Sequence, residues 1–409
     1  MQEFQPSFLK LKIKLKNSRR LKMKKWNSIL FLFFFFVFFL FSPLSYAREK
    51  NIFPTFIDYI GKGNTGITHT SDLRTVFYNP ACILNVENGF YLFDFTFANS
   101  KLLNEIYSAK DNLSSLTNRI RTGENFFGYI NLSGPLYVGF KVSNIQLVVF
   151  HTLNIDVSTY FSFLPYTDVY ANINIIDDIG AAAGFSFPLP IEITGSKWEK
   201  LYWGFSTKIF QRIKGKNTAI HLTDMANMGN PIDFLTEKLN PARTVSITTD
   251  IGAYYSYENL ELGAVVYNLA SLPMSYYPIK IPTVWKSSSD EEIAGYYDSL
   301  KTELGIGASY EFKHLGTIPR KFLKDLVFSI EFNDLFNNTD YPLIYQKIRL
   351  GGEITLSEVI FLRLGFLHGS FAFGIGYQFF IFKIESSFWQ EKIGRNTMTN
   401  WGIQFRMEF

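Results

Sequence analysis

Residues 371–388 read FAFGIGYQFFIFKIESSF, and apolar side chains occupy alternate positions through most of this stretch. One side of residues 371–379 holds Phe371, Phe373, Ile375, Tyr377 and Phe379, while the other holds only Ala, Gly and Gln. The alternation resumes after a break, where Phe382, Ile384 and Phe388 oppose Lys383, Glu385 and Ser387. A repeat of two residues places successive side chains on opposite faces of a strand. The stretch therefore predicts two strands, each with one apolar face and one polar or small face.

The same alternation recurs along the rest of the chain. Further candidate strands are 89–97, 127–142, 145–155, 157–172, 177–187, 199–211, 244–257, 259–268, 303–312, 326–333, 347–356, 360–366 and 399–409. With the long segments allowed to split, we count about 14 strands, give or take about two. Strands of about ten residues with one apolar face are typical of transmembrane barrels.

A soluble β-sandwich also has alternating strands, so the character of the two faces decides. The apolar faces hold mainly Phe, Tyr, Trp, Leu and Ile, whereas the opposite faces hold many Gly and charged residues. Aromatic residues recur near strand ends, where membrane proteins place interfacial girdles; examples are Tyr254, Tyr255, Tyr257, Phe388 and Trp389. A closed barrel also leaves no strand edge unpaired in lipid. We therefore predict an all-β fold, a transmembrane antiparallel β-barrel over residues 89–409.

The N-terminus has the organisation of a secretory signal peptide. Lys24 and Lys25 precede an apolar run at 29–41, and Ser45-Tyr46-Ala47 offers a small-x-small cleavage site. The alternative is a retained transmembrane helix, for which about 20 apolar residues are needed. Because Pro43 ends the run just before the cleavage site, we predict that residues 1–47 are removed. We also hypothesise that Met23 is the true initiator.

Charge and cysteine content exclude several classes. Residues 1–47 hold nine of the 40 basic residues and one of the 36 acidic ones, so the remainder has 31 against 35 and a net charge of −4. A nucleic-acid partner therefore loses its main support. Cys82 is the single cysteine, so no intramolecular disulfide is possible, and we expect a buried thiol. The five histidines lack metal-ligand spacing, and no G-x-S-x-G occurs. We predict neither an enzyme nor a cofactor.

A motif lies in the polar segment before the first strand. Residues 72–83 read DLRTVFYNPACI, within which Phe77, Tyr78, Asn79, Pro80 and Ala81 stand in sequence. This motif resembles the one before the first strand in the FadL-type family of outer-membrane transporters and the related PorV-like and TraF-like barrels. Residues 332–335, 350–354 and 362–366 resemble a later run of strands in the same family. Asn-Pro is also a common turn pair, so the motif has a purely structural interpretation.

The resemblance implies a 14-stranded barrel whose N-terminal segment, residues 48–88, folds inside the lumen as a hatch. It also implies passive transport of hydrophobic compounds, such as long-chain fatty acids, across the outer membrane of a diderm bacterium. Two alternatives stay open: a PorV-like scaffold or shuttle for protein secretion, and a general porin. A hatch argues against an open porin. The implied partners are outer-membrane lipid, the barrel-assembly machinery and a hydrophobic small molecule.

Two segments show near-helical spacing of apolar residues, 101–121 and 220–239. In FadL-like barrels, extracellular loops with short helices form an apolar groove for substrate. The resemblance therefore makes the first segment a candidate apolar ligand groove, formed by Leu102, Leu103, Ile106, Leu113, Leu116 and Ile120. The second is broken and holds Met225 and Met228, whose flexible side chains suit a promiscuous apolar site. The alternative for both is a helix packed over the mouth of the barrel.

The last strand has a feature of its own. Residues 399–409 read TNWGIQFRMEF, and one face holds Trp401, Ile403, Phe405, Met407 and Phe409. A final amphipathic strand ending in Phe resembles the signal by which the assembly machinery recognises barrel precursors. We expect these five residues to act as the assembly signal.

Overall fold

The structure is a computed structural model, and it describes most of the chain beyond residue 53. The described residues are 54–70, 72–100, 118, 127–134, 137–162, 168–190, 199–221, 239, 241–278, 297–312, 323–336, 343–393 and 396–409. All of them belong to one compact unit, Tyr46–Phe409. Most of this unit is β-strand.

The strands follow in chain order with few helices between them. They are β1 (Gly89–Ser100), β2 (Phe127–Ser133), β3 (Val138–Val142), β4 (Ile145–Ser162), β5 (Asp168–Pro188), β6 (Glu199–His221), β7 (Ala242–Tyr257), β8 (Leu260–Ser271), β9 (Met274–Ser275), β10 (Tyr277–Pro278), β11 (Tyr297–Asp298), β12 (Glu303–Glu311), β13 (Leu323–Phe332), β14 (Ile348–Leu356), β15 (Ile360–Leu367), β16 (Ser370–Phe379), β17 (Phe382–Ile393) and β18 (Asn396–Glu408).

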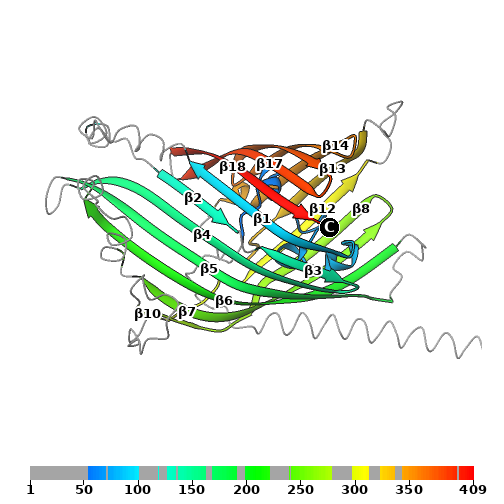
Figure 1. Cartoon of the computed structure of the whole chain (residues 1–409), viewed down its shortest axis with the longest axis horizontal. Helices are drawn as coiled ribbons and strands as arrows, with labels where there is room; N and C mark the ends of the chain where they lie inside the picture. The colour runs from blue at the N-terminus through cyan, green and yellow to red at the C-terminus, as the bar shows by residue number, and fades with distance from the viewer. Residues whose placement is uncertain are drawn as a thin grey trace, which may run out of the picture. The chain divides into compact units, whose positions relative to one another are not determined.

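Antiparallel pairing closes these strands into a barrel. β1 pairs with β18, and β7 pairs with β8, so the main sheet has no free end between them (Figure 1). β2 and β3 both lie between β1 and β4, and they form two halves of one position in the wall. With β9, β10 and β11 outside this ring, the barrel has 14 strands. The predicted fold class and strand number are confirmed.

The two faces of the wall differ as the alternation predicts. On β16, the outward side chains Phe371, Phe373 and Ile375 are 77%, 47% and 48% exposed, while Ala372 between them is 4% exposed. Apolar side chains on this outer surface contact lipid, and inward small or polar side chains line the lumen. Closure satisfies the backbone hydrogen bonds that lipid cannot.

Several local predictions are wrong. The predicted strand 157–172 does not exist as one element, because β4 continues to Ser162 and β5 begins at Asp168. The connection, FLPYT, is apolar and resembles strand sequence. The predicted helix 220–239 starts too early, since β6 runs to His221. Tyr254 and Trp389 are not girdle residues, because both are buried.

The barrel has two different ends. Connections of two or three residues, at 143–144, 258–259, 357–359 and 380–381, lie at the end where β1 begins and β18 stops. We name this the turn end. The strand ends that flank the longest connections, 101–126, 222–241 and 272–302, lie at the opposite end, named the loop end, together with α8 (Ile344–Lys347).

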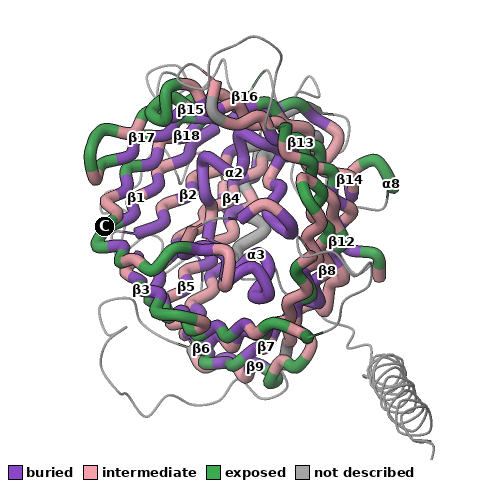
Figure 2. Tube along the Cα trace, turned by 90° about the vertical axis from the view of Figure 1, so that its right-hand side faces the viewer, coloured by how far each residue is buried: buried purple, intermediate pink, exposed green. Residues whose placement is uncertain are grey.

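Residues 54–88, here named the lumenal segment, fold into three short helices. These are α2 (Ile57–Gly61), α3 (Thr75–Tyr78) and the 3₁₀ helix η1 (Pro80–Asn85). α2 and α3 lie inside the ring of strands and are buried (Figure 2). Among the described residues, no helix is long and apolar enough to span a membrane.

Candidate functional site in the barrel lumen

The first part of the lumenal segment is held by the wall from β18 to β13. The N–H of Ile57 donates to Gln404 Oε1 on β18 at 3.0 Å, and Ser387 Oγ on β17 donates to the Ile57 carbonyl at 2.7 Å. Further on, the N–H groups of Gly66 and Ile67 donate to Glu331 Oε1 on β13, at 2.7 and 2.6 Å. Backbone groups that would otherwise be buried without partners are thus satisfied by wall side chains.

The second part turns back along the opposite wall, from β8 to β3. Here the carbonyl oxygens of the segment accept hydrogen bonds from wall side chains. The donor pairs are Tyr267 to Tyr78 (2.7 Å), Ser206 to Val76 (3.1 Å), Ser186 to Ala81 (2.8 Å), Gln146 to Leu73 and Lys141 to Val86. The segment therefore follows the inner circumference and is anchored on both sides of the barrel.

Glycines on the inward faces of the wall strands leave space for the lumenal segment. Gly63, with φ of +71°, lies against Gly365 of β15, and a side chain on Gly365 would collide with the Gly63 backbone. A Cβ added at Gly374 of β16 would lie 3.0 Å from the Cα of Gly61. The small residues on the polar faces of these strands thus mark where the lumenal segment approaches the wall.

The motif residue Asn79 is a structural tie. Its Nδ2 donates to the carbonyls of Ile67 at 2.8 Å and Ala253 at 3.1 Å, and its Oδ1 accepts from the Ala81 N–H at 3.0 Å. Pro80 begins η1, where the missing N–H of proline costs nothing. Phe77 and Tyr78 end α3, and both are buried. The structural interpretation of Asn-Pro is therefore part of the motif's role.

Arg74 is the centre of a buried ionic cluster. Its Nη1 and Nη2 each lie 2.5 Å from an oxygen of Asp58, and its Nε lies 3.0 Å from both oxygens of Asp72. Arg406 of β18 approaches Asp72 at 3.6 Å. Burial alone would raise the pKa of Asp58, but Arg74 and Arg406 hold that pKa well below its usual range. Asp58 is therefore ionised, and the cluster joins α2 to the segment before α3 and to the last strand.

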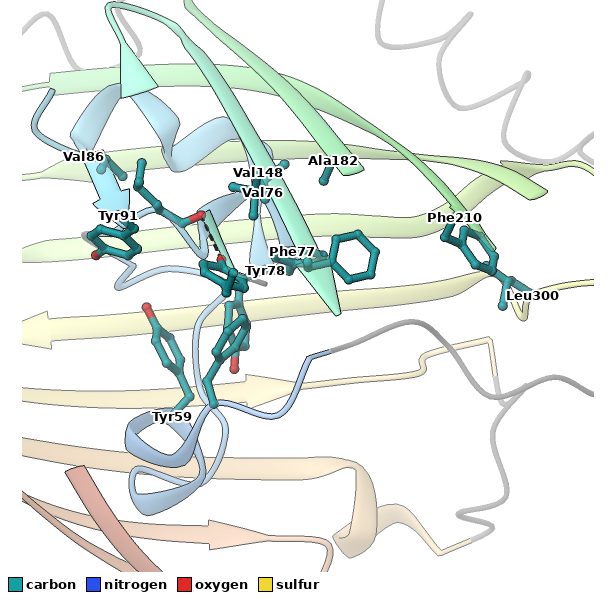
Figure 3. Close-up of a cluster of buried hydrophobic side chains, with 14 of the residues drawn as sticks. Tyr59, Val76, Phe77, Tyr78, Val86, Tyr91, Val148, Ala182, Phe210 and Leu300 are labelled. Atoms are coloured by element: carbon teal, nitrogen blue, oxygen red, sulfur yellow. Dashed lines mark hydrogen bonds between the residues drawn. The ribbon is translucent and has the colours of Figure 1, made fainter. Parts of the chain in front are cut away.

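Buried apolar side chains form one contacting cluster that crosses the lumen; we name it the apolar cluster. It begins near the turn end with Val86 and Tyr91 and reaches Leu300 at the loop end (Figure 3). The members are Phe56, Tyr59, Leu73, Val76, Phe77, Tyr78, Val86, Tyr91, Tyr137, Val148, Phe150, Ala182, Phe210, Ala242, Met274, Tyr276 and Leu300. Phe77 and Phe150 meet edge to face, with ring centroids 5.2 Å apart.

Charged residues beside the apolar cluster are paired. Lys208 of β6 contacts Asp250 of β7, and both are buried. Arg212 forms a two-pronged contact with Asp178 of β5, at 2.7 and 2.8 Å. Their charges are thus already neutralised by neighbours within the wall.

The wall is interrupted between β2 and β3. β1 pairs with β2 at 96–99 and with β3 at 89–91, so among the described residues the pairs of β1 on that side leave out positions 92–95. Tyr137 is buried in the apolar cluster, and its hydroxyl donates to the Leu73 carbonyl at 3.3 Å. We name the described residues between the two halves, Gly134 and Tyr137, the wall break.

The predicted site residues have different outcomes. The candidate groove residues Leu102, Leu103, Ile106, Leu113, Leu116 and Ile120 lie outside the described residues. Of the proposed assembly signal, Trp401 and Phe405 are exposed on the outer face of β18, as is the terminal Phe409. Their role in assembly stays a prediction. Cys82 is buried, and burial raises the pKa of its thiol.

Sequence reasoning missed the residues that anchor the lumenal segment. Glu331, Gln404 and Arg74 were not identified, although the first two lie on the polar face of an alternating strand. A charged or amide side chain on an inward face is the signal that could have found them. The segments 350–354 and 362–366, which carry the later part of the resemblance, are joined by an ion pair. In it, Arg363 Nε lies 2.5 Å from a carboxylate oxygen of Glu353.

Comparison with known proteins gives structural neighbours only. No family model and no curated protein matches the chain. Solved structures similar to it include the toluene transporter TodX of Pseudomonas putida, with 12% identity, 86% of this chain and 97% of that chain covered, and a TM-score of 0.47. The toluene transporter TbuX of Ralstonia pickettii has 11% identity, covers 87% and 98%, and has a TM-score of 0.45.

A third neighbour is the outer membrane phospholipase A of Escherichia coli, with 11% identity, 80% and 98% covered, and a TM-score of 0.24.

Proposed function

We propose that this barrel lets hydrophobic small molecules pass across an outer membrane without an energy source. The observation that carries the proposal is the apolar cluster, which continues from Leu300 at the loop end to Val86 and Tyr91 near the turn end. A water-filled porin has a polar interior instead. An apolar lining with few polar groups is typical of sites for hydrophobic ligands.

The charges beside this cluster favour an uncharged ligand over a fatty-acid anion. Lys208 lies 5.7 Å from the centroid of the Phe77 ring and Arg212 lies 5.6 Å from that of Phe210, and each is paired with a carboxylate. A ligand carboxylate would have to displace Asp250 or Asp178, and separating a buried pair is costly. Long-chain fatty acids remain the narrower alternative.

In this proposal the lumenal segment is a hatch. It fills the lumen between the two walls, and α3 supplies Phe77 at the centre of the apolar cluster. When α3 is displaced, Phe77 loses its apolar contacts. A ligand whose apolar surface takes the place of these contacts lowers the free energy needed to displace α3. The ligand then moves down its gradient through the space released.

Uptake by a deletion strain carrying the wild-type chain or a variant tests the proposal. The probes are an uncharged aromatic hydrocarbon, a long-chain fatty acid and a sugar. Phe210→Gln places an amide in the apolar cluster, and we expect hydrocarbon uptake to fall several-fold because the desolvated amide is unpaired. The matched control is Phe205→Gln, on the outward face of the same strand.

The three candidate functions give different results. Equal hydrocarbon uptake with and without the protein contradicts the proposal. Sugar uptake restored by the wild-type chain would support a porin. Normal uptake in the deletion strain together with loss of secreted surface proteins would support the scaffold.

A further inference from the structure

A second group of buried apolar side chains, here named the Trp389 cluster, packs against α2. Its members are Ile57, Ile60, Ala98, Ala372 and Trp389, and the half-buried Tyr129 of β2 packs against them. Tyr59 of the same helix belongs to the apolar cluster instead. α2 therefore contributes side chains to both clusters.

Asn400 of β18 borders the Trp389 cluster and faces the lumen. It is 0% exposed, whereas the next residue, Trp401, is 41% exposed on the outer face. Asn400 pairs across the ladder with Trp389 of β17 on one side and with Ser100 of β1 on the other. The hydroxyl of Ser100 in turn accepts the Tyr129 N–H at 2.9 Å. Around the inner wall, Asn400 therefore stands between two aromatic residues, Trp389 and Tyr129.

The side-chain amide of Asn400 has no partner. Among the described residues, it is the buried amide for which both the nitrogen and the oxygen lack a hydrogen bond. Gln404, on the same inward face of β18, is the contrast, since its Oε1 accepts from the Ile57 N–H and its Nε2 donates to Asp94. A buried donor or acceptor without a partner is costly, and such a group in a folded protein calls for an explanation. The lumenal segment thus uses one amide of this face and leaves the other unsatisfied.

The surroundings of this amide define the chemistry of a complementary ligand. A carboxamide both donates and accepts hydrogen bonds, and a hydroxyl is a small group that does the same. The nearby acidic residues are Asp156, the cross-strand partner of Tyr129, and Glu391, two positions after Trp389 on the same face. Both would repel a carboxylate or a phenolate. The flanking rings favour an apolar, aromatic body. The complement is therefore an uncharged aromatic molecule with one hydroxyl.

We propose that Asn400 is the polar part of a binding subsite for phenols and aromatic alcohols, whose ring packs against Trp389. The ligand hydroxyl donates to Oδ1 of Asn400 and accepts from Nδ2. The subsite rests on the proposed function and narrows its ligand class, because a pure hydrocarbon leaves the amide unpaired and a hydroxylated relative satisfies it. A site that hydrogen-bonds a ligand hydroxyl discriminates against the analogue that lacks it.

Binding of p-cresol and p-xylene to the full-length barrel in nanodiscs tests the subsite. The two ligands differ by a hydroxyl in place of a methyl group, and titration of empty nanodiscs corrects for partition into lipid. The measured quantity is the ratio of the two dissociation constants. We expect the near-isosteric Asn400→Leu to reduce the preference for p-cresol about tenfold. Trp389→Leu should weaken the binding of both ligands and keep the ratio. The matched control Thr399→Leu, at the neighbouring outward position of β18, should leave both constants unchanged.

The stability of the empty barrel gives a second readout. Because the unpaired amide is a cost in the absence of ligand, Asn400→Leu should raise the midpoint of urea unfolding. A purely structural asparagine predicts a lower midpoint, and that result overturns the proposal. A ratio of dissociation constants that Asn400→Leu does not change also overturns it, because an ordered water alone would then satisfy the amide.

Uptake by cells separates the subsite from the proposed function. A wild-type chain that binds the two ligands with the expected ratio but lets neither enter the cell rejects the proposed function and retains the subsite. A wild-type chain that lets p-xylene enter, with a binding ratio that Asn400→Leu does not change, retains the proposed function and rejects the subsite.

Discussion

The wall from β14 to β18 and the wall from β1 to β4 enclose the same lumen in different ways. In the first, each strand pairs continuously with the next, as in the ladder 382–393 against 396–407. In the second, the position between β1 and β4 is shared by β2 and β3, with the wall break between them. The first wall meets the lumenal segment through inward glycines such as Gly365 and Gly374. The second meets it through Tyr137 and other aromatic side chains.

The wall from β14 to β18 contacts the lumenal segment backbone to backbone, whereas the wall from β1 to β4 contacts it through side chains. Backbone approaches backbone at Gly63 and Gly365, and a packed contact of this kind tolerates little displacement. At the wall break, the Tyr137 hydroxyl donates to the Leu73 carbonyl and the His151 imidazole contacts the Gly134 carbonyl. Side-chain contacts of this kind can be exchanged one at a time, so we infer that the second wall opens more easily than the first.

Removing the centre of the buried ionic cluster should have the largest effect. Arg74→Met leaves Asp58 and Asp72 buried without their main partner, and we expect a loss of about 3–5 kcal/mol of unfolding free energy. A urea titration of the refolded barrel measures it. Adding Asp58→Asn and Asp72→Asn to the same chain should restore much of the loss. An unchanged titration midpoint for Arg74→Met would mean that the cluster does not stabilise the fold.

The same cluster predicts an acid dependence. Because the folded-state pKa of Asp58 is depressed, its contribution is fully present above the unfolded-state pKa and is lost as the pH falls through the folded-state value. The stability difference between wild type and Asp58→Asn should therefore shrink below about pH 4. A difference that stays constant down to strong acid would contradict this sign.

A charged substitution on the outer face of the wall from β14 to β18, here called the continuous wall, should destabilise the barrel. Ile375 is 48% exposed on β16, and Ile375→Arg should cost about 2–4 kcal/mol in the same titration. The matched variant is Ile375→Leu, which keeps the apolar surface and should cost little. An equal cost for the two substitutions would mean that this face does not contact lipid.

Filling a glycine of the continuous wall should cost less but should be specific to the lumenal segment. Gly374→Ala brings a Cβ to 2.8 Å from Ser387 Oγ and 3.0 Å from Gly61, so we expect a loss of about 1–3 kcal/mol from overpacking. It should also increase proteolysis of the lumenal segment. Gly352→Ala is the control, because its Cβ would meet ordinary contacts at 3.4 Å. Equal stabilities would show that the fit at Gly61 is loose.

The smallest effect is expected at the wall break. Tyr137→Phe removes the hydrogen bond to the Leu73 carbonyl and keeps the ring, so about 0.5–1.5 kcal/mol should be lost. Gln146 also donates to that carbonyl and limits the loss. Tyr310→Phe, on an exposed outward position of β12, is the control. A larger cost than that of Gly374→Ala would reverse the ranking of the two walls.

The alternation of residues 371–388 was enough to predict the strands of the continuous wall. Where two strands are joined by a polar turn or a glycine, the pattern also predicts the boundary: the predicted strands 360–366 and 371–379 agree within one residue with β15, which ends at Leu367, and β16, which begins at Ser370. It failed at 157–172 because the apolar connection FLPYT does not interrupt the pattern. It also could not separate girdle residues from lumenal ones, since Tyr254 and Trp389 occupy inward positions of their strands.

The sequence predicted which segment of the chain forms the candidate site, but it did not predict which wall residues anchor that segment. The motif at residues 77–81 indicated the lumenal segment, whereas the anchors Glu331 and Gln404 lie on strands far along the chain. Gln404 contacts Ile57 across 347 residues of sequence. Nothing in the local sequence of either residue states this contact, because it depends on how the barrel closes.

The sequence by itself determined that this chain forms a closed barrel with an apolar exterior, because a period of two depends only on neighbouring residues and on which face meets lipid. The tertiary structure decided the route of the lumenal segment, the partners of Arg74 and the partners of His151. These features depend on contacts between strands that meet only when β1 pairs with β18 and the ring is complete. Closure of the barrel determines which residue each charged side chain pairs with, and this partner decides whether the buried charge is stabilised.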